Sequence, residues 1–452
     1  MKSSYVRMSA VLFAAGIAGT VTNVSVTVVT SALAREWGVP LSTTAVAVLG
    51  LNVSMAFVMP IAGLVAGRRG MRAVLLGGGF VLGASTILLL FAQDVVVLAI
   101  GRLGQGVGLA AITPTAIQAS NNLLPPREHA KALGWWSAAN GAGLALGPAL
   151  GGALFDIGGW RFVPLPTLLI ALFVVISTLG GVPKEMRHEG SVRLYGALVL
   201  SLFAGIAVAV LSAVSLGAWA VAVVAVLALA SLGGYALLGK RRAELPLGWL
   251  RDVMVRRSTT GASVQMFVNG MAQVAVPAWL VTEAITSSGG AGATLLAMTL
   301  TMTVMGPFTG SRSDIPYARW FKTGLLLCAL GVVGLAIGAS VVPWWLALPA
   351  LVVTGIGAGS LLTPSFQAFS QTLPGKDGVG LAMYNICRLS SFAAGGIVGA
   401  AAVDADAAWA GFVVASIVCL VVVTRTFPKV AISRRPEATR DVASATRRSR
   451  PL

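Results

Sequence analysis

Apolar stretches long enough to cross a lipid bilayer recur along the whole chain, and short polar gaps separate them. A membrane-spanning helix needs about 20 predominantly apolar residues, and fourteen stretches of the sequence meet this requirement. The pattern therefore predicts an all-helical membrane protein with fourteen transmembrane helices. The expected spans are residues 8–32, 43–66, 74–92, 95–118, 132–154, 161–182, 194–214, 218–238, 259–282, 291–310, 321–341, 345–363, 379–402 and 408–426.

The polar gaps alternate in charge. Every second gap is rich in lysine and arginine, as in the gap after the second span, which holds Arg68 and Arg72. The gaps between these are mostly acidic and include Asp94, Asp156 and Glu283. Because cytoplasmic loops carry an excess of Lys and Arg, we expect the basic gaps and both termini to face the cytoplasm. The pattern thus predicts a multi-pass protein of the cytoplasmic (inner) membrane.

Composition excludes a soluble globular protein, because hydrophobic residues make up 56% of the chain and charged residues only 10%. The net charge of +17 is spread over many short loops, which argues against a nucleic-acid partner. The tail at 428–452 is basic, and we expect it to be a disordered cytoplasmic segment. His129 and His188 are far apart in the sequence, so we expect no metal site.

An internal repeat organises the chain. Residues 113–125 and 363–374 share a Thr-Pro and Leu-Pro pattern, the second lying 250 residues after the first. We therefore expect residues 1–182 to form one six-helix bundle and 258–427 a second. Residues 183–257 would supply two linker helices and a basic cytoplasmic loop. A duplication of this kind places a substrate path between the two halves, near the middle of the membrane.

Three glycine-rich motifs carry a resemblance to a known family. Residues 63–72 read GLVAGRRGMR, residues 102–108 read RLGQGVG, and residues 143–152 read GLALGPALGG. In these spans and in this order they resemble the signature motifs of the major facilitator superfamily, and the likeness covers residues 10–427. The two central spans are similar to those of the fourteen-span drug:proton antiporter branch. The resemblance implies a secondary active transporter that exports a small organic compound, such as a drug, antibiotic or metabolite, by proton antiport and alternating access.

The resemblance also implies roles for individual residues. It links the motif arginine, Arg102, and its neighbour Gln105 with proton coupling, although a structural arginine held by backbone carbonyls is the alternative. Two positions depart from the family pattern: Gly67 replaces an acidic residue after the second span, and Ala18 replaces an aspartate in the first. The residues expected to act in gating are Gly63, Arg68, Arg72, Gly143, Gly147, Pro148 and Gly151.

Polar residues within the expected spans are the candidates for substrate binding, because a polar group inside a bilayer is costly. Two spans carry polar stripes at helical spacing, which are Thr20, Asn23, Thr27 and Thr30 in the first and Gln265, Asn269 and Gln273 in the ninth. In the resembled superfamily these two helices line the central cavity, so facing stripes would form a hydrogen-bonding pocket. Bonding between packed helices is the alternative. Further lining candidates are Asn52, Trp136, Asn140, Tyr384, Asn385 and Arg388.

Acidic residues are missing from the interior of the expected spans, since all 15 Asp and Glu fall in loops, tails or span ends. The substrate is therefore expected to be neutral, amphipathic or anionic rather than strongly cationic. Asp94, Asp156 and Glu283 are the proton-carrier candidates, and each also reads as a hydrated loop residue. Uniport or anion exchange without proton coupling is the alternative function. An intramembrane enzyme fits less well because no catalytic cluster occurs in the spans. A receptor fits less well because a receptor usually adds a large soluble signalling domain, and the gaps between the spans are short. We expect a monomer that needs the lipid bilayer and a small-molecule substrate, with no cofactor.

Overall fold

The computed structural model of the chain describes residues 2–184, 252–312, 316–340, 344–372 and 378–426. These residues form α-helices and short 3-10 helices without any β-strand, as the apolar pattern predicts. Twelve helices of this described part are long and apolar enough to cross a membrane. The two expected spans at 194–214 and 218–238, like the expected tail at 428–452, lie outside the described residues.

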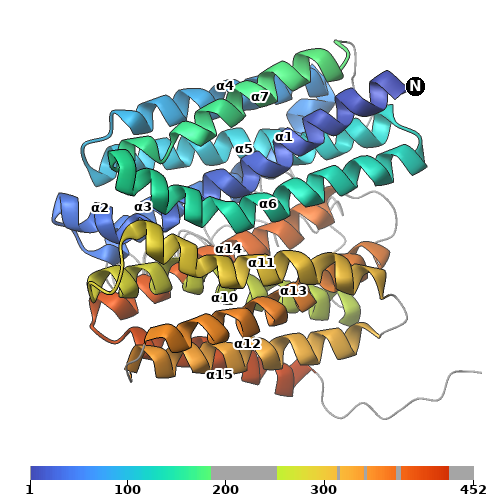
Figure 1. The fold of residues 1–452 in the computed structure, drawn as a ribbon. Coiled ribbons are helices and arrows are strands. Elements are labelled where there is room, and N and C mark those ends of the chain that lie inside the picture. The colour runs from blue at the N-terminus through green and yellow to red at the C-terminus, as the bar shows by residue number, and fades with distance from the viewer. Residues whose placement is uncertain (1, 185–251, 313–315, 341–343, 373–377, 427–452) are drawn as a thin grey trace, which may run out of the picture.

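The first six of these membrane helices form an N-terminal bundle, drawn blue to green in Figure 1. Helix α1 packs against α6 and α7, and α5 packs against α3 and α4. The bundle's helices are α1 (Lys2–Thr27), α2 (Thr30–Trp37), α3 (Leu41–Arg69), α4 (Met71–Leu90), α5 (Val95–Leu123), α6 (Pro126–Gly158), the 3-10 helix η1 (Trp160–Phe162) and α7 (Leu165–Gly181).

The other six form a C-terminal bundle, drawn yellow to red below the first in Figure 1. Helix α10 packs against α14 and α13, and α12 packs against α13 and α15. The helices are α10 (Val253–Thr282), α11 (Ser288–Ser311), α12 (Tyr317–Ser340), the 3-10 helix η4 (Trp344–Leu346), α13 (Ala347–Thr372), α14 (Gly378–Asp404) and α15 (Ala408–Thr426).

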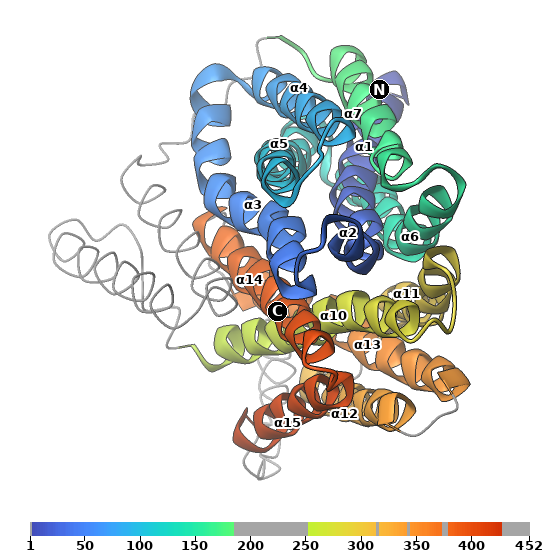
Figure 2. The same cartoon turned by 90° about the vertical axis from the view of Figure 1, so that its left-hand side faces the viewer.

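The two bundles meet along two seams, which Figure 2 shows nearly end-on. Helix α6 packs against α11 on one side, and α3 packs against α14 on the other. Under the internal repeat, α6 corresponds to α14 and α11 to α3, so the seams are equivalent. Apolar residues close the interface near one end, where Leu41 and Leu49 of α3 share a buried cluster with Val274 and Leu280 of α10.

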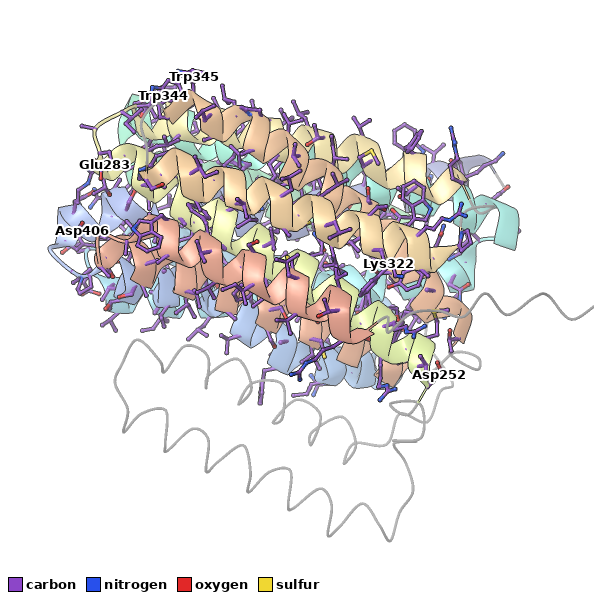
Figure 3. The ribbon with its side chains drawn as sticks, turned by 90° about the horizontal axis from the view of Figure 1, so that it is seen from below. Asp252, Glu283, Lys322, Trp344, Trp345 and Asp406 are labelled. Carbon is purple, nitrogen blue, oxygen red and sulfur yellow. The ribbon has the colours of Figure 1, made fainter. Side chains whose placement is uncertain are left out.

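The two ends of the molecule differ in charge. One end, which we call the acidic end, carries Asp94, Asp156, Glu283, Asp404 and Asp406, and the opposite basic end carries Arg72, Lys131, Arg312, Arg319 and Lys322. Figure 3 shows Glu283 and Asp406 at the acidic end together with Trp344 and Trp345, and Lys322 toward the other end. Trp345 is 55% exposed, as expected for an aromatic anchor at a membrane surface.

The first expected span, 8–32, is not one continuous helix. Helix α1 ends at Thr27 and α2 begins at Thr30. Threonine hydroxyls bond to the backbone on both sides of this break, because Thr27 Oγ1 donates to Val24 O at 2.7 Å and Thr30 Oγ1 donates to Thr27 O at 2.7 Å. Such side-chain bonds compete with the backbone ladder of a helix, which explains why an apolar stretch that reads as one helix is interrupted.

Candidate functional site

Arg102 lies fully buried in the N-terminal bundle, with 0% of its surface exposed. Its Nε donates to Val48 O at 2.8 Å, its Nη1 to Thr22 O at 2.7 Å and its Nη2 to Asn23 O at 3.3 Å. Its Nη1 also donates to Gln105 Oε1 at 2.9 Å. The acceptors are all carbonyl oxygens, which partly compensate for removing a cation from water. Arg102 therefore ties α5 to α1 and α3, in the arrangement expected of a structural arginine.

Gln105 extends this network to a fourth helix. Its Nε2 donates to Thr86 Oγ1 at 2.9 Å, and Thr86 Oγ1 in turn donates to Leu82 O at 2.6 Å. The chain of bonds thus runs from Arg102 on α5 to α4. Chains of this kind rigidify a buried region when every member has a partner.

Asn23 and Asn52 bind each other across α1 and α3. Asn23 Nδ2 donates to Asn52 Oδ1 at 3.1 Å, and Asn52 Nδ2 donates to Asn23 Oδ1 at 3.3 Å. Asn52 is completely buried and Asn23 is partly exposed. The structure therefore brings two predicted lining residues together, and each satisfies the other's amide.

The other members of the first stripe bond within α1 or face α6. Thr20 Oγ1 donates to Gly16 O at 3.2 Å, and a β-carbon on Gly143 would collide with the same hydroxyl. Thr27 donates to its own helix at the α1 break. These contacts keep both threonines within the N-terminal bundle.

The second stripe forms a buried amide column in α10, made of Gln265, Asn269 and Gln273, which are 0%, 2% and 0% exposed. Gln273 Nε2 donates to Asn269 Oδ1 at 2.9 Å, and Gln265 Nε2 contacts the sulfur of Met302 at 3.7 Å. The side-chain carbonyl oxygens of Gln265 and Gln273 are buried and accept no hydrogen bond from the residues that the structure describes. Helices α1 and α10 share few contacts, and the described hydrogen bonds of the two stripes stay within their own bundles.

The remaining lining candidates occupy equivalent places on α6 and α14, because Tyr384 and Arg388 follow Trp136 and Asn140 at an offset of 248 residues. Asn140 Nδ2 donates to Trp136 O at 2.9 Å. The indole nitrogen of Trp136 is buried without a hydrogen-bond partner.

On α14, Tyr384 is 1% exposed and packs against Phe369 with the ring centroids 4.5 Å apart. Arg388 lies over the Tyr384 ring at 5.6 Å, and its Nη1 donates to Asn385 Oδ1 at 3.4 Å. The Tyr384 hydroxyl and the Arg388 Nε are buried and have no hydrogen-bond partner within the described part of the chain. Unlike Arg102, Arg388 therefore keeps unused donor capacity.

The motif glycines of α6 allow close packing of helices. A β-carbon on Gly147 would collide with Val24, and one on Gly151 would collide with the backbone oxygen of Ser25. Pro148 lies inside α6, and its carbonyl oxygen stands where a β-carbon on Gly292 of α11 would lie. The motif thus seats α6 between α1 and α11, with small residues at the contacts.

The motif after the second span is described only in part. Gly63 and Arg68 lie near the end of α3, and their surroundings are outside the described part of the chain. Arg72 Nη1 donates to Val182 O at 3.2 Å, directly after α7. This bond stays within the N-terminal bundle.

A model of the major facilitator superfamily matches residues 11–239 and 259–452. The chain belongs to this superfamily. It is therefore a multi-pass membrane transporter, as its sequence motifs suggest.

The relatives of the transporter include a protein named for riboflavin transport and proteins named for drug efflux or multidrug resistance. A riboflavin transporter of Clostridioides difficile, RibZ, is 25% identical over 328 residues, which is 70% of each chain. The drug efflux pump JefA of Mycobacterium tuberculosis is 31% identical over 162 residues, 34% of this chain and 32% of the pump. A putative multidrug resistance protein of Klebsiella pneumoniae, MdtD, is 26% identical over 160 residues, 35% of this chain and 34% of that protein. The match to the latter two thus spans about a third of their length.

The carboxylates at the acidic end of the transporter differ in what they bind. Asp94 caps its own helix by accepting from the backbone nitrogens of Val96 and Val97, both at 2.9 Å. Glu283 is exposed and lines a small cavity with Asp406. Asp156 accepts hydrogen bonds from Ser287 and Gly289 of the opposite bundle.

Asp404 is a residue that sequence reasoning missed, and it also binds the opposite bundle. A signal for it exists in the internal repeat, because it follows Asp156 at the offset of 248 residues that relates Gly147 to Gly395.

Proposed function

We propose that this transporter exports a small organic compound across the cytoplasmic membrane by alternating access, driven by proton antiport. The observation that carries the proposal is the buried amide column of α10, with its two unused carbonyl oxygens. A buried acceptor without a partner costs about 1–3 kcal/mol. Donor groups on a bound compound would remove that cost at Gln265 and Gln273.

The column also constrains the compound. Gln265 and Gln273 are eight residues apart on one helix, which corresponds to about 12 Å along the helix axis. A ligand that satisfies both needs N–H or O–H groups at two well-separated places. Val268, Met271 and Met302 belong to the buried apolar cluster of this region, so we expect the rest of the compound to be apolar or aromatic. The relatives named for riboflavin and for drugs support an organic solute.

Orientation follows from charge. The basic end holds most of the lysines and arginines of the described short loops, so the positive-inside rule supports a cytoplasmic position for this end. The acidic end then faces outward. Export would move the compound from the basic end to the acidic end.

Proton coupling is proposed to involve Asp156. Of the three nominated carriers, Asp94 caps its own helix and Glu283 lines a small cavity within the C-terminal bundle, whereas Asp156 accepts hydrogen bonds from the opposite bundle. The hydrogen-bond donors of Asp156 belong to the other bundle, so the surroundings of this carboxylate change when the bundles separate. In this proposal Arg102 and Gln105 act as positioning residues that keep α1, α3 and α5 together.

Anion exchange is the second candidate function, and Arg388 favours it. Among the described residues its buried Nε has no partner, and the acceptor of its Nη1 bond, Asn385, is neutral. A carboxylate or other anion on a substrate would satisfy the free side of this guanidinium. Exchange of anions would require no proton gradient.

The test is transport into proteoliposomes with and without an imposed pH gradient, using neutral, anionic and cationic compounds together with riboflavin. Export by proton antiport predicts gradient-dependent transport of a neutral or amphipathic compound. Transport that does not depend on the pH gradient but requires an anion on the opposite side of the membrane would support anion exchange instead. No transport of any compound class under either condition, by protein that is monodisperse, would contradict both.

A matched pair of variants ties transport to the amide column. Gln273→Leu removes one unused carbonyl, and we expect it to lower apparent affinity for the compound about tenfold. Thr299→Val is the control, because Thr299 is equally buried but already donates to Leu295 O at 3.0 Å within α11. Equal effects of the two variants would argue against the column as the binding site.

A further inference from the structure

Asp156, at the end of α6, reaches across to the start of α11 in the other bundle. Its Oδ2 accepts from Ser287 Oγ at 2.8 Å and from the backbone nitrogen of Gly289 at 2.9 Å. Ser287 is the residue that precedes α11, and Gly289 is in its first turn. A carboxylate from the N-terminal bundle thus caps a helix of the C-terminal bundle.

Asp404, at the end of α14, does the same in the opposite direction. Its Oδ1 accepts from the backbone nitrogen of Leu41 at 2.9 Å, and its Oδ2 accepts from that of Ser42 at 2.7 Å. Leu41 and Ser42 are the first residues of α3. The residue before them is Pro40, whose side chain makes no capping bond, so Asp404 supplies the cap that the local sequence lacks.

The two contacts are equivalent under the internal repeat. Asp156 and Asp404 are 248 residues apart, and the helices they cap begin at Ser288 and Leu41. Each bundle therefore donates one carboxylate and receives one. Both contacts lie at the acidic end of the molecule.

Capping by a carboxylate is favourable for two reasons. It satisfies backbone N–H groups that have no partner in the first turn of a helix, and its charge interacts well with the positive end of the helix dipole. Here both benefits exist only while the bundles touch. The bonds to Asp156 and Asp404 are lost if the acidic end separates.

The backbones pack closely beside the Asp156 cap, because a β-carbon on Gly152 would collide with the backbone of Ser288. On the other seam, a β-carbon on Gly396 would meet the side chain of Leu49. Arg35 Nη1 adds a further bond between the bundles by donating to Val281 O at 3.4 Å. The acidic end is therefore closed by backbone-level contact and by two reciprocal caps.

We propose that Asp156 and Asp404 form a two-fold latch in which each carboxylate caps a helix of the opposite bundle, and that both caps must break before the acidic end can open. The latch concerns the conformational cycle and does not depend on which compound is carried. Asp94 provides a matched comparison, because it makes the same kind of cap within one bundle.

The test measures the separation of the bundles with spin-label pairs. Labels replace Arg161 and Ser340, which are exposed at the acidic end of opposite bundles. A second pair replaces Lys131 and Arg319, exposed at the basic end. The background lacks the three cysteines, Cys328, Cys387 and Cys419. The distances between the labels are measured by pulsed electron paramagnetic resonance without substrate. The result is therefore independent of the transport assay.

Asp156→Ala or Asp404→Ala should raise the ratio of open to closed acidic ends about fivefold, equivalent to about 1 kcal/mol for one cap. The double variant should raise it about 25-fold, because the two sites are separate. The distance between the labels at the basic end should shorten in the same molecules, which distinguishes rocking of the bundles from local fraying. Asp94→Ala should leave both distance distributions unchanged.

Unchanged distances in the double alanine variant, or the same shift in Asp94→Ala, would overturn the latch. If the alanine variants are not monodisperse, Asp156→Asn and Asp404→Asn decide the question, because asparagine keeps the side-chain size and one acceptor oxygen. These should open the acidic end less than alanine and more than Asp94→Asn does. No opening beyond that of Asp94→Asn would also overturn the proposal.

Discussion

Asn23 and Asn52 form a reciprocal pair of amide hydrogen bonds between α1 and α3, at 3.1 and 3.3 Å. The backbone carbonyl of the same Asn23 also accepts from Arg102. One residue of α1 therefore contacts two neighbouring helices through different groups. The three helices α1, α3 and α5 are held together at this level by polar bonds that the apolar packing around them cannot replace.

Removing one member of this pair should destabilise the protein. Asn52→Ala leaves the partly buried amide of Asn23 without its partner, at an expected cost of about 1–2 kcal/mol. Asn23→Ala/Asn52→Ala should cost less than the sum of the single variants, because the remaining partner is removed as well. Thermal unfolding in detergent measures both. Additive losses would contradict a direct interaction.

Arg102 should be sensitive to geometry as well as to charge. Arg102→Lys keeps the cation but cannot reach four carbonyl oxygens with a planar fork, so it should be nearly as unstable as Arg102→Ala. The unfolding temperature and the transport activity of both variants, measured on the same samples, test this expectation. A lysine variant of normal stability that loses only the response to a pH gradient would instead support direct proton coupling.

Gly151 should tolerate no side chain, because a β-carbon there collides with the backbone oxygen of Ser25 and the two helices must shift. Gly151→Ala should cost about 1–3 kcal/mol and reduce transport. Gly77→Ala is the control, since a β-carbon at Gly77 meets no atom within 4 Å. Similar behaviour of the two variants in an unfolding assay would argue against the close seam.

Gln265→Met should separate stability from function. The carbonyl oxygen of Gln265 is buried without a partner and its Nε2 contacts only a sulfur at 3.7 Å, so an apolar side chain of similar shape should be neutral or stabilising. Binding of the transported compound should weaken if the amide column holds it. A compound-dependent thermal shift, compared between the two proteins, reports both effects. An unchanged shift would remove Gln265 from the binding site.

His129, near the start of α6, should make stability depend on pH. Partial burial lowers the pKa of His129 below its usual value of 6.5, and its Nδ1 lies 2.9 Å from Ser120 Oγ. The unfolded chain then binds a proton more readily than the folded one, so stability should fall as the pH drops through about 6.5. Unfolding temperatures from pH 7.5 to 5 test this. His129→Gln should flatten the profile.

The span pattern predicts the helices of the described chain well, because apolar length is the property that a bilayer selects. The expected span 408–426 coincides with α15, and 161–182 agrees closely with η1 and α7. The break between Thr27 and Thr30 was not predicted, since hydroxyl groups that compete for the backbone leave the apolar pattern unchanged.

The candidate site is predictable only at the level of residue type. The sequence indicates that Arg102 needs partners, but the carbonyls it binds belong to α1 and α3 and depend on tertiary packing. Asp404 illustrates the limit more sharply, because an acidic residue after a span usually reads as hydrated. Its value as a cap depends on a helix that begins 363 residues earlier, at Leu41.

The gap between α1 and α2 has a mechanical consequence. By sequence α2 is the tip of the first span, yet it packs against α10, and its Arg35 bonds to Val281 there. A turn at Val28 and Val29 joins this tip to the rest of the span. This turn can act as a hinge, so that α2 stays packed against α10 while α1 changes its orientation.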